Sequence, residues 1–307
     1  MSASAAVLQE LTAAVTDCRD AFRGGLKGLD PVVRDPVERG FQARIDRALG
    51  KPMLGEVAPH LLTGMFNARE DSFLGFVGPW MDIYTATVLA DDGIDGQNPA
   101  TNAEVLVTSM LLLQRGQSGI YRAMPVSGNA SLLFDGFFAE AAQAVLVEFQ
   151  RRARVTSYTE KDIDHLGRKV ALLKLCATCI LIADGQEVSG ELLVPIEWLA
   201  TGMQLLDDIT DWEEDLSAGN FTPLLSQTIR FVEARPVAWD HQDHLQGIAA
   251  IVLSGSLEQC IERAIAQLQK VAALPNLKHG SIAERLLDAI IRENPYWGSI
   301  TQAGLFF

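Results

Sequence analysis

The sequence predicts an all-α protein, a single-domain bundle of about ten helices that spans residues 1–307. Apolar residues recur at helical spacing along nearly the whole chain, and no segment alternates between apolar and polar residues as a half-buried strand would. The two stretches that could be linkers, 116–130 and 234–241, are short enough to be loops within one domain. Apolar residues make up 48% of the chain, which is enough for a substantial core.

Glycine and proline mark the limits of the helices in the first half of the chain. Gly50 ends one helix, Gly93 ends another, and Pro79 indicates a break or a late start within a third. The segment 116–130 is rich in glycine, serine and proline and is expected to be a loop. The predicted helices are therefore 2–23, 32–49, 52–68, 73–92, 101–115 and 131–155.

A capping signal opens the second half. Thr159 to Asp162 reads Thr-Glu-Lys-Asp, a capping box in which aspartate replaces the usual glutamate, and one helix is expected to run from it to about Ala183. The next helix, 190–214, is expected to end before Gly219. The last third of the chain predicts helices at 223–234, 241–254, 256–273 and 280–293.

The composition excludes several classes of function. A formal net charge of −14 argues against nucleic acid or an anionic membrane surface as the main partner. No apolar run approaches the roughly 18 residues that a membrane-spanning helix needs, and the N-terminal segment lacks the features of a signal peptide. No second cysteine pair or nearby histidine completes a zinc site, so we expect buried free thiols and a cytoplasmic location, with the cysteines at Cys18, Cys176, Cys179 and Cys260.

Two acidic clusters, each following an apolar run, are the most informative feature of the chain. They span Asp91–Asp95 (Asp-Asp-Gly-Ile-Asp) and Asp207–Asp215. Residues four apart share a helix face, so the aspartates of each cluster would form a stripe and repel one another unless a cation compensates. Oxygen ligands alone suit Mg²⁺, which substrate phosphates commonly complete. The predicted metal ligands are Asp91, Asp92, Asp95, Asp207, Asp208, Asp211 and Asp215.

These clusters resemble the two aspartate-rich motifs of the trans-prenyl diphosphate synthases, within the class I isoprenoid synthase superfamily. The segment Gln204–Asp211 (Gln-Leu-Leu-Asp-Asp-Ile-Thr-Asp) resembles the second motif, and Asp215–Leu225 resembles the turn that follows it, with Asn220 where lysine is usual. The resemblance covers roughly residues 45–230. It implies a helical bundle around a central active-site cavity, three Mg²⁺ ions, a prenyl diphosphate substrate and a homodimer.

Departures from the family pattern decide which reaction the sequence favours. Lys51 remains in the segment that resembles Gly-Gly-Lys-Arg, but the arginine is missing, and no arginine follows Asp95 in the stretch 96–102. Those cations bind the acceptor, isopentenyl diphosphate, in the family. The sequence therefore favours a class I terpene synthase that ionises an allylic diphosphate and lets the carbocation cyclise or lose a proton. The alternatives are a prenyltransferase, with isopentenyl diphosphate or another acceptor, and a non-catalytic partner subunit.

Further site residues follow from the resemblance and from residue type. Lys169, with Arg168, Lys174 and Gln204, is expected to contact the diphosphate, and Asp91, Asp95, Asp207, Asp211 and Lys169 are the predicted catalytic residues. Aromatic faces can stabilise a carbocation. The candidates are Phe73, Phe76, Trp80 and Tyr84, together with Phe134, Phe137 and Phe138.

Each of these residues also has a plain structural interpretation. Arg168 and Lys169 could form surface ion pairs with Asp164 or Glu160, Lys174 could extend to the surface, and the aromatic residues could be ordinary core residues. In the family, bulky residues four and five positions before the first motif shorten the pocket. Thr87 and Ala86 are small, which implies a C15 or C20 substrate. The C-terminal aromatic segment 294–307 could cover the site or pack elsewhere, and the sequence leaves both open.

Overall fold

The computed structural model describes residues 3–48, 50–94, 102–124, 130–235 and 244–293. The described chain is entirely helical, with 14 α-helices, two short 3₁₀ helices and no strand among these residues. The predicted all-α class is confirmed. The count of about ten helices was too low: the twelve predicted segments become 14 α-helices in the described residues, because two of them are each divided into two α-helices.

The first half of the chain follows the predicted order of helices. Pro79 was expected to mark a break or a late start, and the α-helix around it indeed begins only at Val77, after the 3₁₀ helix η1 (Leu74–Phe76). The six α-helices of this half are α1 (Ala3–Leu26), α2 (Pro31–Arg47), α3 (Leu54–Met65), α4 (Val77–Ile94), α5 (Asn102–Ala123) and α6 (Ala130–Arg152).

The prediction of a loop at 116–130 was wrong for residues 116–123, which continue α5. A Cβ atom on Gly116 would lie 2.6 Å from the carbonyl oxygen of Pro79, and one on Gly119 would lie 2.5 Å from the Pro79 ring. The glycines therefore allow α5 to pack closely on α4 and do not end the helix. Glycine as a helix breaker and glycine as a contact point look alike in the sequence.

The second half is more interrupted than expected. The capping box is confirmed, because the Thr159 hydroxyl accepts from the Asp162 amide and the Asp162 carboxylate accepts from the Thr159 amide. The single helix expected from there to Ala183 is instead three segments, and 190–214 is divided at Asp211. The elements are α7 (Glu160–Asp164), η2 (Leu166–Val170), α8 (Leu172–Ala183), α9 (Gly190–Thr210), α10 (Trp212–Ala218), α11 (Pro223–Glu233), α12 (His244–Leu253), α13 (Ser256–Ala272) and α14 (Ile282–Glu293).

Close packing on α9 explains why η2 is not part of a longer α-helix. Gly167 lies against α9, where a Cβ atom would be 2.3 Å from the Glu197 carbonyl oxygen, and its amide donates to the Thr201 hydroxyl at 3.1 Å. This contact takes the backbone amide out of a regular α-helical ladder. The two basic residues Arg168 and Lys169 therefore project from a 3₁₀ helix.

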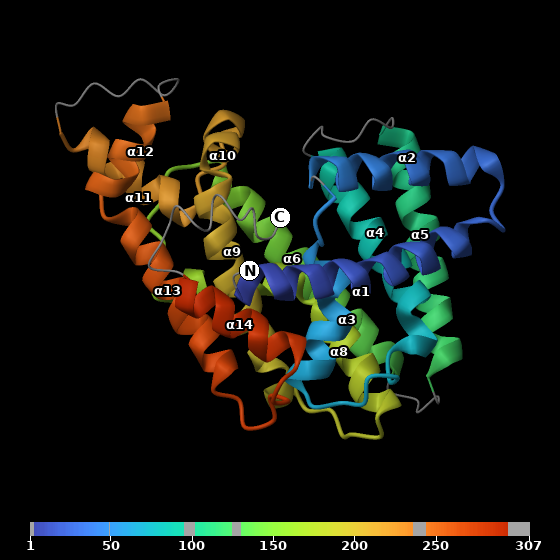
Figure 1. Cartoon of the computed structure of the whole chain (residues 1–307). Coiled ribbons are helices and arrows are strands. Elements are labelled where there is room, and N and C mark those ends of the chain that lie inside the picture. Colours follow the sequence, from blue (N-terminus) through green and yellow to red (C-terminus); the bar gives the residue numbers. More distant parts are fainter. Residues whose placement is uncertain (1–2, 49, 95–101, 125–129, 236–243, 294–307) are drawn as a thin grey trace.

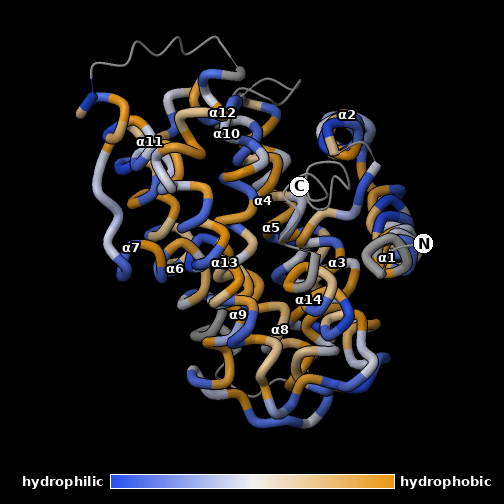
Figure 2. Tube along the Cα trace, turned by 60° about the vertical axis from the view of Figure 1, so that its left-hand side comes forward, coloured by the Kyte–Doolittle hydropathy of each residue, from blue (hydrophilic) through white to orange (hydrophobic). Residues whose placement is uncertain are grey.

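The helices pack into one core that brings the two ends of the described chain together. Helix α1 packs against α3, α4 and α14, so the first and last helices lie side by side (Figure 1). Hydrophobic and hydrophilic stretches alternate along most helices (Figure 2), as expected for amphipathic elements. All four cysteines are free and buried, as predicted. No helix in the described ranges is long and apolar enough to cross a membrane.

Candidate active site

The first acidic cluster lies in the last turn of α4, where an arginine pair from α2 holds it. Asp92 is only 1% exposed, and its Oδ1 accepts from Arg44 Nη1 at 2.9 Å. Its other oxygen, Oδ2, pairs with Arg47. Asp91 is exposed next to this pair. Asp95, the remaining predicted ligand of this cluster, lies outside the described residues.

The second cluster begins at the C-terminal end of α9, with one donor organising its first two carboxylates. Gln204 Nε2 donates to Asp208 Oδ1 at 3.0 Å and to Asp207 Oδ2 at 3.3 Å. Asp207 Oδ1 is buried, and no hydrogen-bond donor among the described residues reaches it. Burial, followed by the neighbouring Asp211 carboxylate, raises the pKa of Asp207 well above its usual value. A cation bound here would offset the repulsion between the Asp207 and Asp211 carboxylates and provide a partner for Asp207 Oδ1.

The break between α9 and α10 keeps the remaining aspartates in helical register. The Asp211 amide donates to the Asp207 carbonyl at 3.0 Å, and the Asp215 amide donates to the Asp211 carbonyl at 2.9 Å. Gly219, with a φ of 72°, then turns the chain, and the Asn220 amide donates to the Asp215 carbonyl at 2.8 Å. Asn220, where the family usually has lysine, thus folds back on the cluster as a neutral residue.

Arg44 links the two clusters electrostatically. Burial lowers the pKa of Arg44, but Tyr84, Asp92 and Asp91 outweigh burial and raise the pKa above its ordinary value. Arg44 also acts on the second cluster. The Asp211 side chain is exposed as a whole, yet partial burial of its carboxyl group raises its pKa, and Arg44 opposes that rise. Arg44 therefore acts electrostatically on carboxylates of both clusters.

Each basic residue predicted to contact diphosphate has a carboxylate partner, but of the three only Lys169 acts on a described carboxylate of the second cluster. Arg168 and Lys174 both pair with Glu197, ten residues before Asp207 on α9. Lys169 lowers the pKa of Asp207, against the larger raising effects of burial and Asp211, and its Nζ lies 3.2 Å from Glu148 Oε1. Arg168 pairs with Glu197 at 3.7 Å, and not with Asp164 or Glu160 as the surface interpretation proposed.

Lys174 does not extend to the surface, so that alternative was wrong. Its side chain is 8% exposed, and Nζ lies 2.7 Å from Glu140 Oε1 and 2.5 Å from Glu197 Oε1. The lysine thereby joins α6, α8 and α9 through one buried ion-pair network. Its predicted role as a diphosphate ligand stays a prediction.

No protein-family model matches the sequence, and no curated protein sequence is significantly similar to it. Solved structures match the chain over nearly its whole length. A geranylgeranyl pyrophosphate synthetase from the archaeon Geoglobus acetivorans covers 95% of this chain and 97% of its own, with a TM-score of 0.71 and 15% identity. The chain has the isoprenoid synthase fold.

Two further structures share this isoprenoid synthase fold. A polyprenyl synthase from Caulobacter crescentus CB15, complexed with calcium and isoprenyl diphosphate, covers 94% of this chain and 96% of its own, with a TM-score of 0.66 and 16% identity. A heptaprenyl diphosphate synthase from Staphylococcus aureus covers 94% and 98%, with a TM-score of 0.65 and 15% identity. The predicted isoprenoid synthase fold is therefore confirmed.

In this isoprenoid synthase fold the four aromatic candidates around α4 are all tightly packed. Trp80 is buried and donates from Nε1 to the Gly55 carbonyl at 2.7 Å, and Tyr84 stacks on it with ring centroids 6.4 Å apart. Phe73 packs edge-on against His60, and Phe76 is buried in the core. Whether any of them faces a bound substrate stays a prediction.

Tyr84 is the aromatic residue most directly connected to the first cluster. Burial, followed by Glu56, raises the pKa of its hydroxyl, and Tyr84 is one of the groups that act on Arg44. One turn further along α4, Thr87 Oγ1 donates to the Tyr84 carbonyl at 2.8 Å, and Ala86 is fully buried. The remaining candidates lie on α6, where Phe137 is buried, Phe138 is half-buried and the Phe134 side chain lies outside the described part.

Sequence reasoning missed the residues that neutralise the site. Arg44 and Arg47 are three residues apart on one face of α2, just before Lys51, but nothing in the sequence indicates that this face meets α4. Glu140 and Glu197, the partners of Lys174, were missed for the same reason. Their spacing is ordinary for solvent-exposed helix faces, so only the packing reveals them.

Proposed function

We propose that this protein ionises an allylic prenyl diphosphate in a reaction that depends on Mg²⁺. The observation that carries the proposal is the buried Asp207 Oδ1, which has no donor in the described chain and lies beside the Asp211 carboxyl group. Carboxylates crowded in this way fit a divalent cation. Asp91, Asp207, Asp211 and Asp215 would hold Mg²⁺, with Asp95 as a further ligand.

Other residues of the chain would position these ligands and the leaving group. Gln204 orients Asp207 and Asp208, while Arg44 and Arg47 hold Asp92, whose role is therefore support more than direct ligation. Bound Mg²⁺ supplies charge neutralisation for the departing diphosphate. Lys169 would exchange Glu148 for a diphosphate oxygen and donate a hydrogen bond to it.

Transfer of the prenyl group to an acceptor is the fate of the carbocation that we favour. The three structural neighbours are named as synthases of geranylgeranyl, polyprenyl and heptaprenyl diphosphates, which supports the prenyltransferase alternative over the terpene synthase that the sequence favoured. Cyclisation or proton loss remains the second candidate, because no arginine follows the first cluster and Asn220 replaces the usual lysine. A C15 or C20 allylic substrate fits the small residues Ala86 and Thr87.

The test is a product analysis with a matched pair of variants. Purified protein and Mg²⁺ are incubated with geranyl, farnesyl or geranylgeranyl diphosphate, each with and without isopentenyl diphosphate. We expect diphosphate release that Asp207→Asn abolishes and that the exposed control Asp20→Asn leaves unchanged. A longer prenyl diphosphate identifies an elongating transferase, and a hydrocarbon or alcohol formed without acceptor identifies a terpene synthase. No diphosphate release from any substrate would defeat both.

Assembly as a homodimer is part of the proposal, since large apolar side chains are exposed on the outer faces of α5 and α6. Leu106, Val107 and Met110 on α5 and Leu146 and Phe149 on α6 are each 58–64% exposed. A second copy of the chain would cover such faces. Light scattering of the wild type should give twice the chain mass, and Leu106→Glu with Met110→Glu should give the single mass. A cytoplasmic location stays a prediction.

A further inference from the structure

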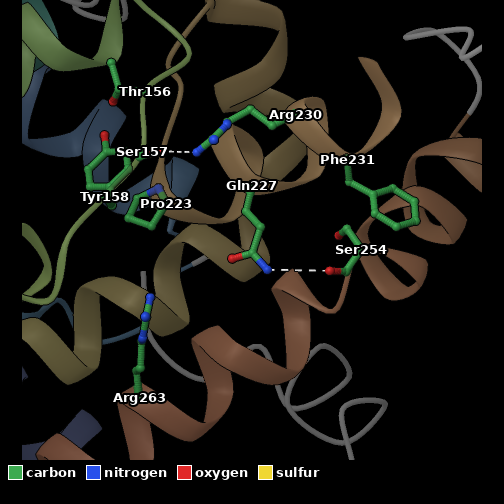
Figure 3. Close-up of a pocket in the computed structure, with 9 residues that line it drawn as sticks. All are labelled: Thr156, Ser157, Tyr158, Pro223, Gln227, Arg230, Phe231, Ser254 and Arg263. Atoms are coloured by element: carbon green, nitrogen blue, oxygen red, sulfur yellow. Dashed lines mark hydrogen bonds between the residues drawn. The ribbon is translucent and has the colours of Figure 1, made fainter. Parts of the chain in front are cut away.

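A cavity lies among the loop before α7, helix α11 and helix α13, and its described lining includes no residue of either acidic cluster (Figure 3). Its volume is about 410 Å³, within the range of pockets that hold small molecules. The cavity is wider than a bare inorganic anion needs. Nothing in the proposed reaction uses it.

The charge of this cavity is opposite to that of the protein. The chain carries a net charge of −14, yet the described lining contains Arg230 and Arg263 and no acidic residue. Arg230 uses Nη1 on the Ser157 hydroxyl, and Arg263 uses Nη2 on Glu160. A guanidinium group has five N–H donors, so both arginines keep donors for which the described residues offer no acceptor.

Hydrogen bonds to the buried hydroxyl groups of Thr228 and Ser256 fix the lining residue Ser254. Thr228 and Ser256 are fully buried, with Oγ atoms 2.7 Å apart, and Ser254 Oγ donates to Ser256 Oγ at 2.9 Å. Gln227 Nε2 reaches the Ser254 carbonyl at 3.5 Å, as Figure 3 shows. Hydrogen bonds within the protein therefore hold the side chains of Ser254 and Gln227, which line the cavity, in place.

Two aromatic residues, Tyr158 and Phe231, also line the cavity. The Tyr158 hydroxyl donates to the Phe221 carbonyl at 2.9 Å, which fixes that ring from the back. The Phe231 ring carries Arg235 on one face, with the guanidinium carbon 3.6 Å from the ring centroid. Figure 3 shows the Tyr158 ring beside the guanidinium end of Arg230 and the Phe231 ring on the far side of Gln227.

We infer that this cavity binds a phosphorylated small molecule. Its phosphate group would lie between Arg230 and Arg263, whose planar donors match phosphate oxygens. Its organic part would lie against the Tyr158 ring, beside Arg230. The shared chemistry is a phosphate on an apolar or aromatic body, for which a nucleotide and a prenyl phosphate are the two sources. Binding at this site needs no metal.

The experiment is calorimetry on the full chain in the presence of EDTA, which removes metal-dependent binding at the acidic clusters. The probes are adenosine monophosphate, geranyl diphosphate and inorganic diphosphate, with adenosine as the uncharged control. We expect one organic phosphate to bind at a single site, and Arg230→Gln to weaken it about tenfold or more. Arg263→Lys, which keeps a charge for Glu160 but loses the planar fork, should also weaken it.

The controls separate this cavity from the proposed active site. Arg122→Gln removes the same charge from an exposed position on α5, and Asp207→Asn alters the second acidic cluster; neither should change the affinity. Preference for the nucleotide or for the prenyl compound identifies the source. The inference is overturned if neither organic phosphate binds, if Arg230→Gln and Arg263→Lys bind as wild type does, or if Asp207→Asn abolishes binding. Equal affinity for inorganic diphosphate overturns the role assigned to the Tyr158 ring.

Discussion

The arginine clamp on Asp92 leads to a prediction in which two substitutions are coupled through one buried carboxylate. Asp92 is 1% exposed, and Arg44 and Arg47 bind different oxygens of it. If one arginine is replaced by glutamine, the other still compensates the charge. If both are replaced, the carboxylate is left buried without a cation. The loss of stability should therefore be greater for the double variant than for the two single variants added together.

The magnitudes follow from the exposure of the partners. A lost hydrogen bond to a charged group costs about 1.5–3 kcal/mol. The Arg44 and Arg47 side chains are 32% and 35% exposed, so water partly replaces the contact and the lower end applies. We expect each single substitution to lower the free energy of unfolding by about 1–2 kcal/mol. A buried charge that loses all its partners costs about 3–5 kcal/mol, so we expect the double variant near the top of that range.

Urea unfolding followed by circular dichroism measures these free energies, and a double-mutant cycle gives the coupling. Arg39→Gln, on the same helix but 54% exposed, is the matched control and should change the free energy of unfolding by less than about 0.5 kcal/mol. In the Asp92→Asn background the coupling should vanish, because the shared charge is gone. Additive effects of Arg44→Gln and Arg47→Gln, or equal coupling in both backgrounds, would refute the reasoning.

Three other outcomes test the packing and the buried charges. A Cβ atom on Gly167 would lie 2.3 Å from the Glu197 carbonyl oxygen, so Gly167→Ala should lower the free energy of unfolding by about 1–3 kcal/mol. The control Gly190→Ala, where a Cβ atom would have nothing within 4 Å, should not lower it. Equal effects of the two substitutions in urea unfolding would count against the close contact. Lys174→Met leaves Glu140 without its lysine and Glu197 with only the longer Arg168 contact, and should destabilise by about 3 kcal/mol. Adding Glu197→Gln should restore part of this stability; no recovery would contradict the network. Burial raises the pKa of Asp82 from 3.8 to about 6, although its partner Arg115 lowers it. The protonated form of Asp82 therefore favours the folded state. This stabilisation is complete below about pH 3.8 and is lost as the pH rises through about 6. The stability of the wild type relative to Asp82→Asn should accordingly fall by up to about 3 kcal/mol between pH 4 and pH 6.5, and a pH-independent difference would exclude the shift.

Features that depend on neighbouring residues could be predicted well. The helical class followed from the spacing of apolar residues, and the late start of α4 followed from Pro79. The capping box at Thr159 was predicted correctly, because its two hydrogen bonds join residues only three apart. The isoprenoid synthase fold was expected from two acidic clusters in a particular order, and the structural neighbours confirm that fold.

The same local signals misled where two helices touch. Gly116 and Gly119 looked like a loop, but they let α5 approach Pro79 of α4. Gly167 looked like an ordinary helix residue, but it sits against α9 and leaves η2 as a separate 3₁₀ segment. A missing side chain weakens a helix in isolation and strengthens it in a close contact, so the outcome depends on a partner helix that local sequence does not specify.

By itself, then, the sequence determined the helical class, the order of the helices and the two carboxylate clusters, because periodicity and spacing are properties of nearby residues. Only the tertiary structure decided which charges meet. Arg44 and Arg47 reach Asp92 across 48 and 45 residues. Arg230 and Arg263, which line the cavity between α11 and α13, come from different helices. A buried charge must find an opposite charge, but any helix face packed nearby can supply it. The identity of the partner is therefore settled by how the helices pack.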